Sequence, residues 1–232
     1  MMHFQNLFLI LILFTIIVLI VQRSNKKKYI QKEFKKKYEK MNNYDHKLYW
    51  EDLNQKTILG TLYQKFFLYP IITKHIHGKL IDIGAGLGDM CVYYKNSVAS
   101  DINKFSIENY KRRNLENILI EENKINYSDC TFDTALMDNV LEHISDPNLL
   151  LLEVRRILKE DGKLIIGVPG IKGYESDFDH KVFYDEEKLE KLLTGFNFKT
   201  INKFYVPLKS NYLSKNLNLY CLYSVSKKVG EI

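Results

Sequence analysis

The fold of this chain is indicated most clearly by one stretch, Leu80-Ile81-Asp82-Ile83-Gly84-Ala85-Gly86-Leu87-Gly88. Its first four residues form a short, mostly apolar run, which predicts a buried strand. Three glycines follow at once, and a helical pattern begins at Gly88. Because glycine has no Cβ, a loop built from it lets the backbone approach a bound ligand closely. This order of strand, glycine loop and helix predicts a ligand-binding loop in a parallel α/β sheet.

The glycines are spaced G-x-G-x-G, and this spacing restricts the ligand. A dinucleotide fingerprint reads G-x-G-x-x-G, but Asp89 stands where its third glycine belongs. The spacing therefore disfavours a nicotinamide-dependent reductase, whose loop cradles a pyrophosphate. The glycine loop alone is only moderately specific for one class of ligand, so the class of protein depends on further motifs in the chain.

Short apolar segments alternate with helical ones on both sides of this loop. Helical spacing of apolar residues covers much of 41–78, with an interruption at Pro70. We expect strands at 79–83, 97–101, 118–120, 132–137 and 163–168, and a closing strand pair at 198–206 and 217–226. Further helices are expected at 104–114, at 146–158 with Gly162 ending that helical region, and at 185–193. This alternation is typical of a parallel sheet.

Two carboxylates flank the glycine loop along the predicted sheet. Asp101 ends the next strand, where a carboxylate can accept hydrogen bonds from both hydroxyls of a ribose. Capping of the helix at 104–114 is the structural alternative for Asp101. Asp82 lies just before the loop, and its alternative is a structural hydrogen-bond acceptor inside the loop.

Four further segments follow in order. The first, Glu121 to Asp133, ends in Phe-Asp at the start of a predicted strand, and the second follows that strand and reads Asp138-Asn139-Val140-Leu141-Glu142-His143-Ile144. The third, 153–164, precedes Val168-Pro169, and the fourth, 180–196, ends in Gly195-Phe196. Over about residues 79–200 the chain resembles the class I S-adenosylmethionine-dependent methyltransferases, in the broad group acting on small molecules, quinones, lipids and sugars. The resemblance implies a doubly wound, mostly parallel, seven-stranded Rossmann-like sheet with an antiparallel final strand.

The same resemblance implies S-adenosyl-L-methionine as the cofactor and assigns residues to it. Glu121 is the candidate for the adenine amino group, and the segment that begins at Asp138 lies by the methionine end. His143, in Leu-Glu-His, is more often structural. The departures are Asp161, where a second glycine or proline is common, and Asn139, where an acidic residue is common. The expected cofactor-binding residues are Asp82, Gly84, Ala85, Gly86, Gly88, Asp101, Ile102, Glu121, Asp138 and Asn139.

Methyl transfer is an in-line displacement, in which the protein mainly orients the reactants and excludes water. A general base is not obligatory, but it helps with an oxygen acceptor. His180 is the first candidate for such a base and Tyr184 the second. The alternative for His180 is a packing or capping role beside the helix at 185–193. Residues 170–184, rich in Asp, Gly and aromatics, are expected to form a lid over the acceptor.

The first forty residues predict a membrane anchor. Residues 4–21 are almost all apolar and long enough, at about 27 Å, to nearly span a bilayer core. No Lys or Arg precedes the run and no small-residue cleavage site ends it, which favours a retained anchor over a signal peptide. The alternative is a buried core helix. We expect an anchor at 1–22, a basic linker at 23–43, and a methyltransferase domain at 44–232, with helices at 44–78 and the sheet and lid at 79–232.

The charge of the chain is concentrated next to this anchor. Residues 22–40 hold nine Lys or Arg and two Glu, a charge of +7, so the rest of the chain carries about −1 of the net charge of +6. Basic residues beside a span stay in the cytosol, which places the domain at the cytosolic membrane face. A solvated helical linker is the alternative reading of this run. We expect a lipid-like or small-molecule acceptor and no nucleic acid, whose binding needs positive charge on the folded domain.

The chain has three cysteines. Cys91, Cys130 and Cys221 are odd in number and lack paired ligand spacing, so we expect reduced thiols and no metal site. A membrane-bound scaffold that keeps the fold without turnover remains an alternative to an enzyme. The sequence leaves open the acceptor and the methylated atom.

Overall fold

The computed structural model describes residues 46–54 and 56–230 of the 232-residue chain. The predicted anchor at 1–22 and the basic linker at 23–43 both lie outside the described residues. Within the described residues, no helix is long and apolar enough to cross a bilayer.

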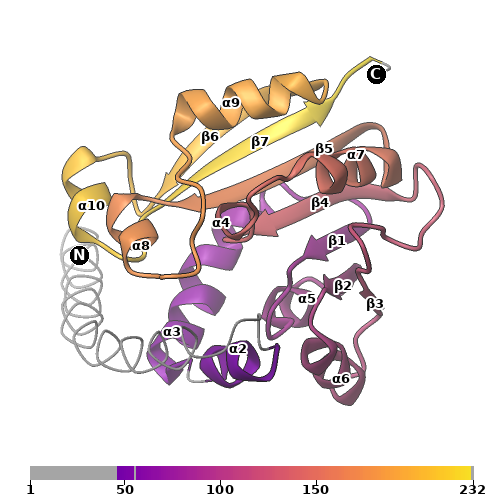
Figure 1. The fold of residues 1–232 in the computed structure, drawn as a ribbon, viewed down its shortest axis with the longest axis horizontal. Helices are drawn as coiled ribbons and strands as arrows, with labels where there is room; N and C mark the ends of the chain where they lie inside the picture. The colour runs from indigo at the N-terminus through magenta and orange to yellow at the C-terminus, as the bar shows by residue number, and fades with distance from the viewer. Residues whose placement is uncertain (1–45, 55, 231–232) are drawn as a thin grey trace, which may run out of the picture.

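A single mixed sheet organises the described residues (Figure 1). Its strands are β1 (Leu80–Ile83), β2 (Ser97–Asp101), β3 (Asn117–Leu119), β4 (Phe132–Asp138), β5 (Leu158–Pro169), β6 (Phe198–Val206) and β7 (Cys221–Lys228). The spatial order is β3-β2-β1-β4-β5-β7-β6. Strands β1 to β5 pair in parallel, and β7 is antiparallel to both β5 and β6. The predicted seven-stranded sheet with an antiparallel final strand is confirmed.

Helices cover both faces of the sheet. They are α2 (His46–Leu53), α3 (Ile58–Tyr63), the π-helix η1 (Gln64–Leu68), α4 (Tyr69–Thr73), α5 (Asp89–Tyr93), α6 (Lys104–Arg112), the 3-10 helix η2 (Leu141–His143), α7 (Asn148–Ile157), α8 (Ile171–Glu175), α9 (Glu186–Gly195) and α10 (Asn211–Asn216). Alternate residues of β1, β4 and β5 enter two different cores. One core takes apolar residues from α7 and α9, and the other from α4 and α5. The sheet is therefore doubly wound, as predicted.

Strand order reverses between β1 and β4. From β1 the chain continues to β2 and β3 on one side, and later strands add beyond β4 on the other. In open parallel sheets, ligands bind beyond the carboxyl ends of the strands at such a reversal. The residues that end β1, β2 and β4 therefore define the edge at which a site is expected, and Figure 1 shows α2 close to this edge.

Some predicted boundaries are wrong, and local contacts explain why. The helix predicted to run to Leu158 ends one residue earlier, at Ile157, and β5 begins at Leu158 instead of at Lys163. Leu158 pairs with Phe132, and the ladder then shifts register before Lys163, so the stretch with Asp161 at φ 64° is an irregular start of a strand. Helix α7 begins one residue later than predicted, at Asn148, whose N–H donates to the Asp146 carboxylate at 3.1 Å. Helices α8 and α10 were not predicted.

Candidate active site

The glycine loop (residues 84–88) leaves β1 in a backbone conformation that needs glycine. Gly84 has φ 68° and Gly88 has φ 77°, both in the left-handed region. A Cβ on Gly84 would lie 2.6 Å from Val140 Cγ2, and one on Gly88 would lie 2.9 Å from Leu115 Cδ1. The loop is therefore pressed against the segment that follows β4 on one side and against the end of α6 on the other.

Asp101 ties this loop to the end of β2. Its Oδ2 accepts from the Gly86 N–H at 3.2 Å and from the Tyr110 hydroxyl at 3.3 Å, and its Oδ1 accepts from the Asn103 N–H at 2.9 Å. Burial raises the pKa of Asp101 although these hydrogen bonds act to lower it. The N-cap of α6 is Asn103, whose side chain accepts from the Phe105 N–H at 3.0 Å, so the capping alternative for Asp101 is wrong.

Two more carboxylates lie along the same edge. Asp82 is buried, and burial together with the charges of Asp138 and Asp101 raises its pKa well above the usual range. Asp138 Oδ1 accepts from the Tyr223 hydroxyl at 2.7 Å and from the Asn139 side chain at 3.0 Å. Burial raises the pKa of Asp138 as well, although both hydrogen bonds oppose the shift. The structure thus brings three predicted cofactor residues, Asp82, Asp101 and Asp138, within electrostatic reach of one another.

The other predicted cofactor residues are more exposed. The Ala85 N–H donates to the Ser100 carbonyl at 2.9 Å, which fixes the loop against β2. Ile102 and Asn139 are exposed at the ends of β2 and β4. Glu121 follows β3, one strand further out, and its side chain is exposed. Contacts of these residues with a cofactor stay a prediction.

Helix α2 packs beside α6 and the end of β2. The Asn103 side chain donates to the His46 carbonyl at 2.8 Å, and Lys56 pairs with Asp89 at 2.5 Å. The pKa of Tyr49 is raised by burial first, and then by the charges of Asp101, Asp177, Asp179 and Glu142. The apolar periodicity predicted a helix in this region, but it did not predict which side of α2 packs against α6.

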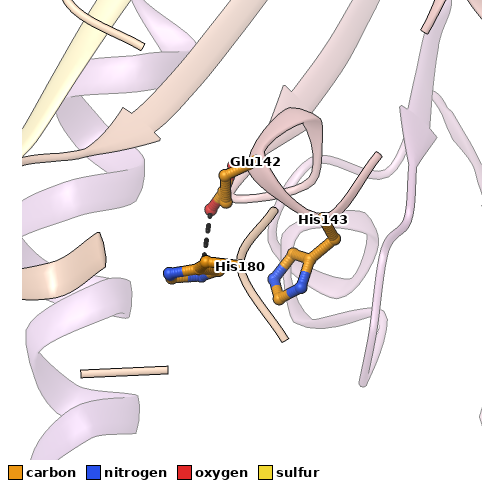
Figure 2. A group of neighbouring side chains, drawn as sticks. All are labelled: Glu142, His143 and His180. Atoms are coloured by element: carbon orange, nitrogen blue, oxygen red, sulfur yellow. Dashed lines mark ion pairs between the residues drawn. The ribbon is translucent and has the colours of Figure 1, made fainter. Parts of the chain in front are cut away.

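His180, the first candidate base, belongs to a group that we call the Glu-His-His cluster, formed by the buried Glu142 and the partly buried His143 and His180. Figure 2 shows the Glu142 carboxylate pointing toward His180, with the His143 ring beside them. The distance from Glu142 Oε1 to His180 Nε2 is 3.8 Å, and the two histidine rings meet edge to face at 4.6 Å. Tyr49 lies edge-on to His143, with ring centroids 6.4 Å apart.

Outer hydrogen bonds fix both histidine rings of the cluster. His143 Nδ1 lies 3.0 Å from the Asp179 carboxylate, and His180 Nδ1 lies 2.8 Å from the Tyr174 carbonyl. Burial opposes the charged form of His143, but Asp179 and Glu142 outweigh it and raise its pKa. For His180 burial dominates and lowers the pKa. At neutral pH His180 is therefore an uncharged imidazole whose Nε2 can accept a proton.

Glu142 is the acid of this cluster, and it is almost completely buried. It is 1% exposed, and burial raises its pKa to about 7. The sequence pattern Leu-Glu-His suggested helix packing here, and it gave no sign that Glu142 meets His180, which is distant in the chain. Asp179 was missed for the same reason, although the run Asp177-Phe-Asp179-His180 concentrates acidic residues beside the candidate base.

Tyr184, the second candidate base, packs in the core with α7 and α9. It is 5% exposed, and burial followed by the charge of Glu142 raises its pKa, so it does not ionise readily. Lys188 stands four residues later, with its Nζ 5.3 Å from the Tyr184 ring centroid. This is the Tyr-x-x-x-Lys spacing used by some reductases, but here the tyrosine ring is a core residue. Its catalytic role stays a prediction.

Comparison with known proteins gives the class of this site. Residues 81–166 match a family model described as a methyltransferase domain. The chain is 27% identical over 177 residues to a putative methyltransferase of Dictyostelium discoideum, covering 70% of this chain and 67% of that protein. It is 26% identical over 139 residues to an uncharacterized protein of Methanocaldococcus jannaschii, covering 60% of this chain and 66% of that protein.

A solved structure supports the same assignment at the level of fold. A SAM-dependent methyltransferase from Aquifex aeolicus superposes with a TM-score of 0.61 at 17% identity, over 81% of this chain and all of that one. The sheet order, the glycine loop and the carboxylate after β2 define a class I methyltransferase fold. Residues 81–166 thus match a methyltransferase domain, and the chain has the fold of the S-adenosylmethionine-dependent methyltransferases. About a third of the length of each of the two relatives lies outside the matched region.

Proposed function

We propose that this protein transfers the methyl group of S-adenosylmethionine to a small or membrane-associated acceptor, at the cytosolic face of a membrane. The observation that carries the proposal is the placement of the Glu-His-His cluster, in which Glu142 and His143 directly follow β4, the strand that ends at the predicted cofactor residue Asp138. A cofactor site alone would suit any methyltransferase. The cluster adds proton-accepting groups near the place where an acceptor would meet the methyl group.

The residues present fit the cofactor. Without a Cβ at Gly84 and Gly88, the glycine loop keeps its left-handed backbone and packs closely against Val140 and Leu115, which leaves its main chain as the surface that a cofactor would meet. Asp101 Oδ2 is already engaged by the Gly86 N–H and the Tyr110 hydroxyl, whereas Oδ1 accepts from the Asn103 N–H and keeps an acceptor direction that suits a ribose hydroxyl. When bound, the cofactor supplies an electrophilic methyl group for in-line displacement. The protein orients the acceptor and keeps water away.

His180 has the geometry of a base for a hydroxyl acceptor. Its Nδ1 lies against the Tyr174 carbonyl, which can only accept, so the ring carries its proton there and leaves the Nε2 lone pair available. The lowered pKa of His180 keeps that lone pair unprotonated at neutral pH. As the acceptor oxygen forms its new bond to the methyl carbon, His180 Nε2 takes the hydroxyl proton.

Two features support a membrane-associated acceptor. The first is the apolar run 4–21 followed by the basic run 22–40. The second is a stripe of exposed apolar side chains on α3 and η1, at Ile58 (79% exposed), Leu62 and Phe66 (70% exposed). Residues four apart lie on one face of a helix, so these side chains form a common surface. A tethered enzyme gains effective concentration only when its second substrate is at the same membrane.

Labelled methyl transfer tests this function. Membranes containing the full-length protein are incubated with S-adenosylmethionine labelled in the methyl group, and organic-extractable and water-soluble fractions are counted. We expect label in the organic fraction. Exclusive labelling of a water-soluble metabolite or of protein would contradict the membrane-associated acceptor. Cofactor binding without any transfer would favour the non-catalytic scaffold.

Removal of His180 gives a matched prediction for the same assay. We expect His180→Ala to lower turnover by about 10² to 10⁴, because the proton acceptor is lost, and to leave cofactor affinity unchanged. His75→Ala is the control, since His75 stacks on Phe204 with ring centroids 4.7 Å apart, in the other core. Unchanged turnover of His180→Ala would return His180 to a structural role.

A further inference from the structure

We propose that Glu142, His143 and His180 bind a divalent transition-metal ion of the Zn²⁺ type. One ligand atom from each residue lies within 4.8 Å of the other two (Figure 2). Two imidazoles and one carboxylate form a donor set used by catalytic zinc and by non-haem iron. The expectation of no metal site rested on the cysteines, which take no part here.

The buried carboxylate of Glu142 is the strongest sign that a ligand is needed. Within the described part of the chain, neither of its oxygens accepts a hydrogen bond from another residue. His180 Nε2 lies 3.8 Å from Glu142 Oε1, beyond hydrogen-bond distance. A carboxylate that is 99% buried is costly unless it is paired or bound to a metal. A cation placed between these atoms would satisfy it.

Both imidazoles are already oriented as metal ligands. The Nδ1 atom of each ring is engaged, with the Asp179 carboxylate for His143 and with the Tyr174 carbonyl for His180. Each Nε2 therefore remains as the ligand atom. Metal-binding histidines characteristically donate their other ring nitrogen to a carboxylate or a main-chain carbonyl, which fixes the tautomer and the ring plane. Here the partner of His143 is a carboxylate, that of Asp179, and the partner of His180 is a main-chain carbonyl, that of Tyr174.

Distances and charge agree with this assignment. Donor atoms about 2.1 Å from a tetrahedral ion lie roughly 3.4 Å apart. The Glu142 to His180 separation of 3.8 Å is close to that value, and the limit of 4.8 Å requires modest side-chain rotation. Asp138 and Asp177 place further negative charge around the cluster, which favours a cation. Imidazole ligands favour zinc-like ions over Mg²⁺ and Ca²⁺, which prefer oxygen.

The metal would also define the acceptor, an inference that rests on the proposed function. Three protein ligands leave a coordination position open. A hydroxyl oxygen bound there loses its proton to water more readily, because the ion lowers the hydroxyl pKa. That oxygen then forms the bond to the methyl carbon as the carbon-sulfur bond of the cofactor breaks. His180 acts in this case as a ligand and not as the base, and the acceptor is a phenol, enol or alcohol.

Metal binding to the chelator-treated full-length protein tests the site, with Zn²⁺ and Mg²⁺ titrated separately and metal content measured after dialysis. We expect one Zn²⁺ per chain and no stable Mg²⁺. Glu142→Gln and His180→Ala should lower Zn²⁺ affinity by more than about 100-fold, and Asp179→Asn by about 10- to 100-fold. His75→Ala and Cys130→Ser are controls and should bind normally, the second because Cys130 is the exposed thiol of the described residues.

Two results would overturn the metal site: no stoichiometric Zn²⁺, or equal affinity in wild type and Glu142→Gln. Glu142→Gln keeps the shape of the side chain, and its fold is checked by binding of S-adenosylhomocysteine. Cofactor binding without zinc defeats the metal site and leaves the proposed function standing. Zinc binding that depends on Glu142, with no methyl transfer under any condition, defeats the proposed function and keeps the metal site.

Discussion

Asp101 shows how one side chain links loop, strand and ligand. It ends β2, and its two oxygens accept main-chain hydrogen bonds from Gly86 and Asn103. The carboxylate thus fixes the loop before any ligand arrives. The pattern of strand, glycines and a later carboxylate predicted the position of Asp101 at the sheet edge. It could not predict the contact with Tyr110, because that contact depends on how α6 packs beneath the loop.

Substitution of Asp101 should weaken cofactor binding. We expect Asp101→Ala to reduce affinity for S-adenosylmethionine and S-adenosylhomocysteine about thirtyfold, which corresponds to about 2 kcal/mol for loss of a charge-assisted contact to ribose. Calorimetry measures it. Asp129→Ala is the matched control, since the Asp129 side chain is 73% exposed and pairs with Arg156 on the surface. Equal affinities for Asp101→Ala and wild type would remove the ribose assignment.

At the scale of elements, Arg156 on α7 holds the segment between β3 and β4. Its guanidinium donates to the carbonyls of Ile125 and Tyr127 and pairs with Glu153 and Asp129. The Glu153 carboxylate in turn accepts from the Ile125 N–H at 2.7 Å. This network ties a loop without regular structure to a helix. The same loop begins just after the predicted adenine contact Glu121.

Loss of this network should lower stability. We expect Arg156→Ala to reduce the free energy of unfolding by about 1 to 2 kcal/mol, since the bonds involve charge but are partly exposed. Chemical denaturation measures it, with Arg112→Ala on the exposed face of α6 as the control. A loss no larger than in the control would contradict the role of Arg156.

The network also has a pH dependence with a definite sign. The hydrogen bond from Arg156 holds the pKa of Glu153 below its ordinary value of 4.5. Its contribution is therefore fully present above that value and is lost as the pH falls through the lowered pKa of the folded state. The stability difference between wild type and Arg156→Ala should shrink in this acidic range.

The elements of the sheet were predictable to different degrees. Strand β2 and strand β6 have the predicted bounds, because turn residues and apolar runs mark both ends. The start of β5 was not predictable, since Leu158 leaves the helix to pair with Phe132, a contact between segments far apart in sequence. The Glu-His-His cluster was hidden for the same reason: η2 and the segment before α9 meet only in the folded chain.

For the whole molecule, the anchor is the prediction that lies outside the described residues. We expect the full-length protein to sediment with membranes and to resist extraction by high salt, because apolar insertion is not screened. A chain beginning at Met41 should remain in solution. Release of the full-length protein by salt alone would leave only electrostatic adhesion and would contradict the anchor.

The central claim is that this fold binds S-adenosylmethionine through the glycine loop and the carboxylates at the ends of β1, β2 and β4. The most direct measurement is a calorimetric titration of the full-length protein, in detergent, with S-adenosylhomocysteine and separately with NADH. We expect saturable binding of S-adenosylhomocysteine at one molecule per chain and no binding of NADH. Absence of S-adenosylhomocysteine binding by folded protein, or binding of NADH in its place, would contradict this claim.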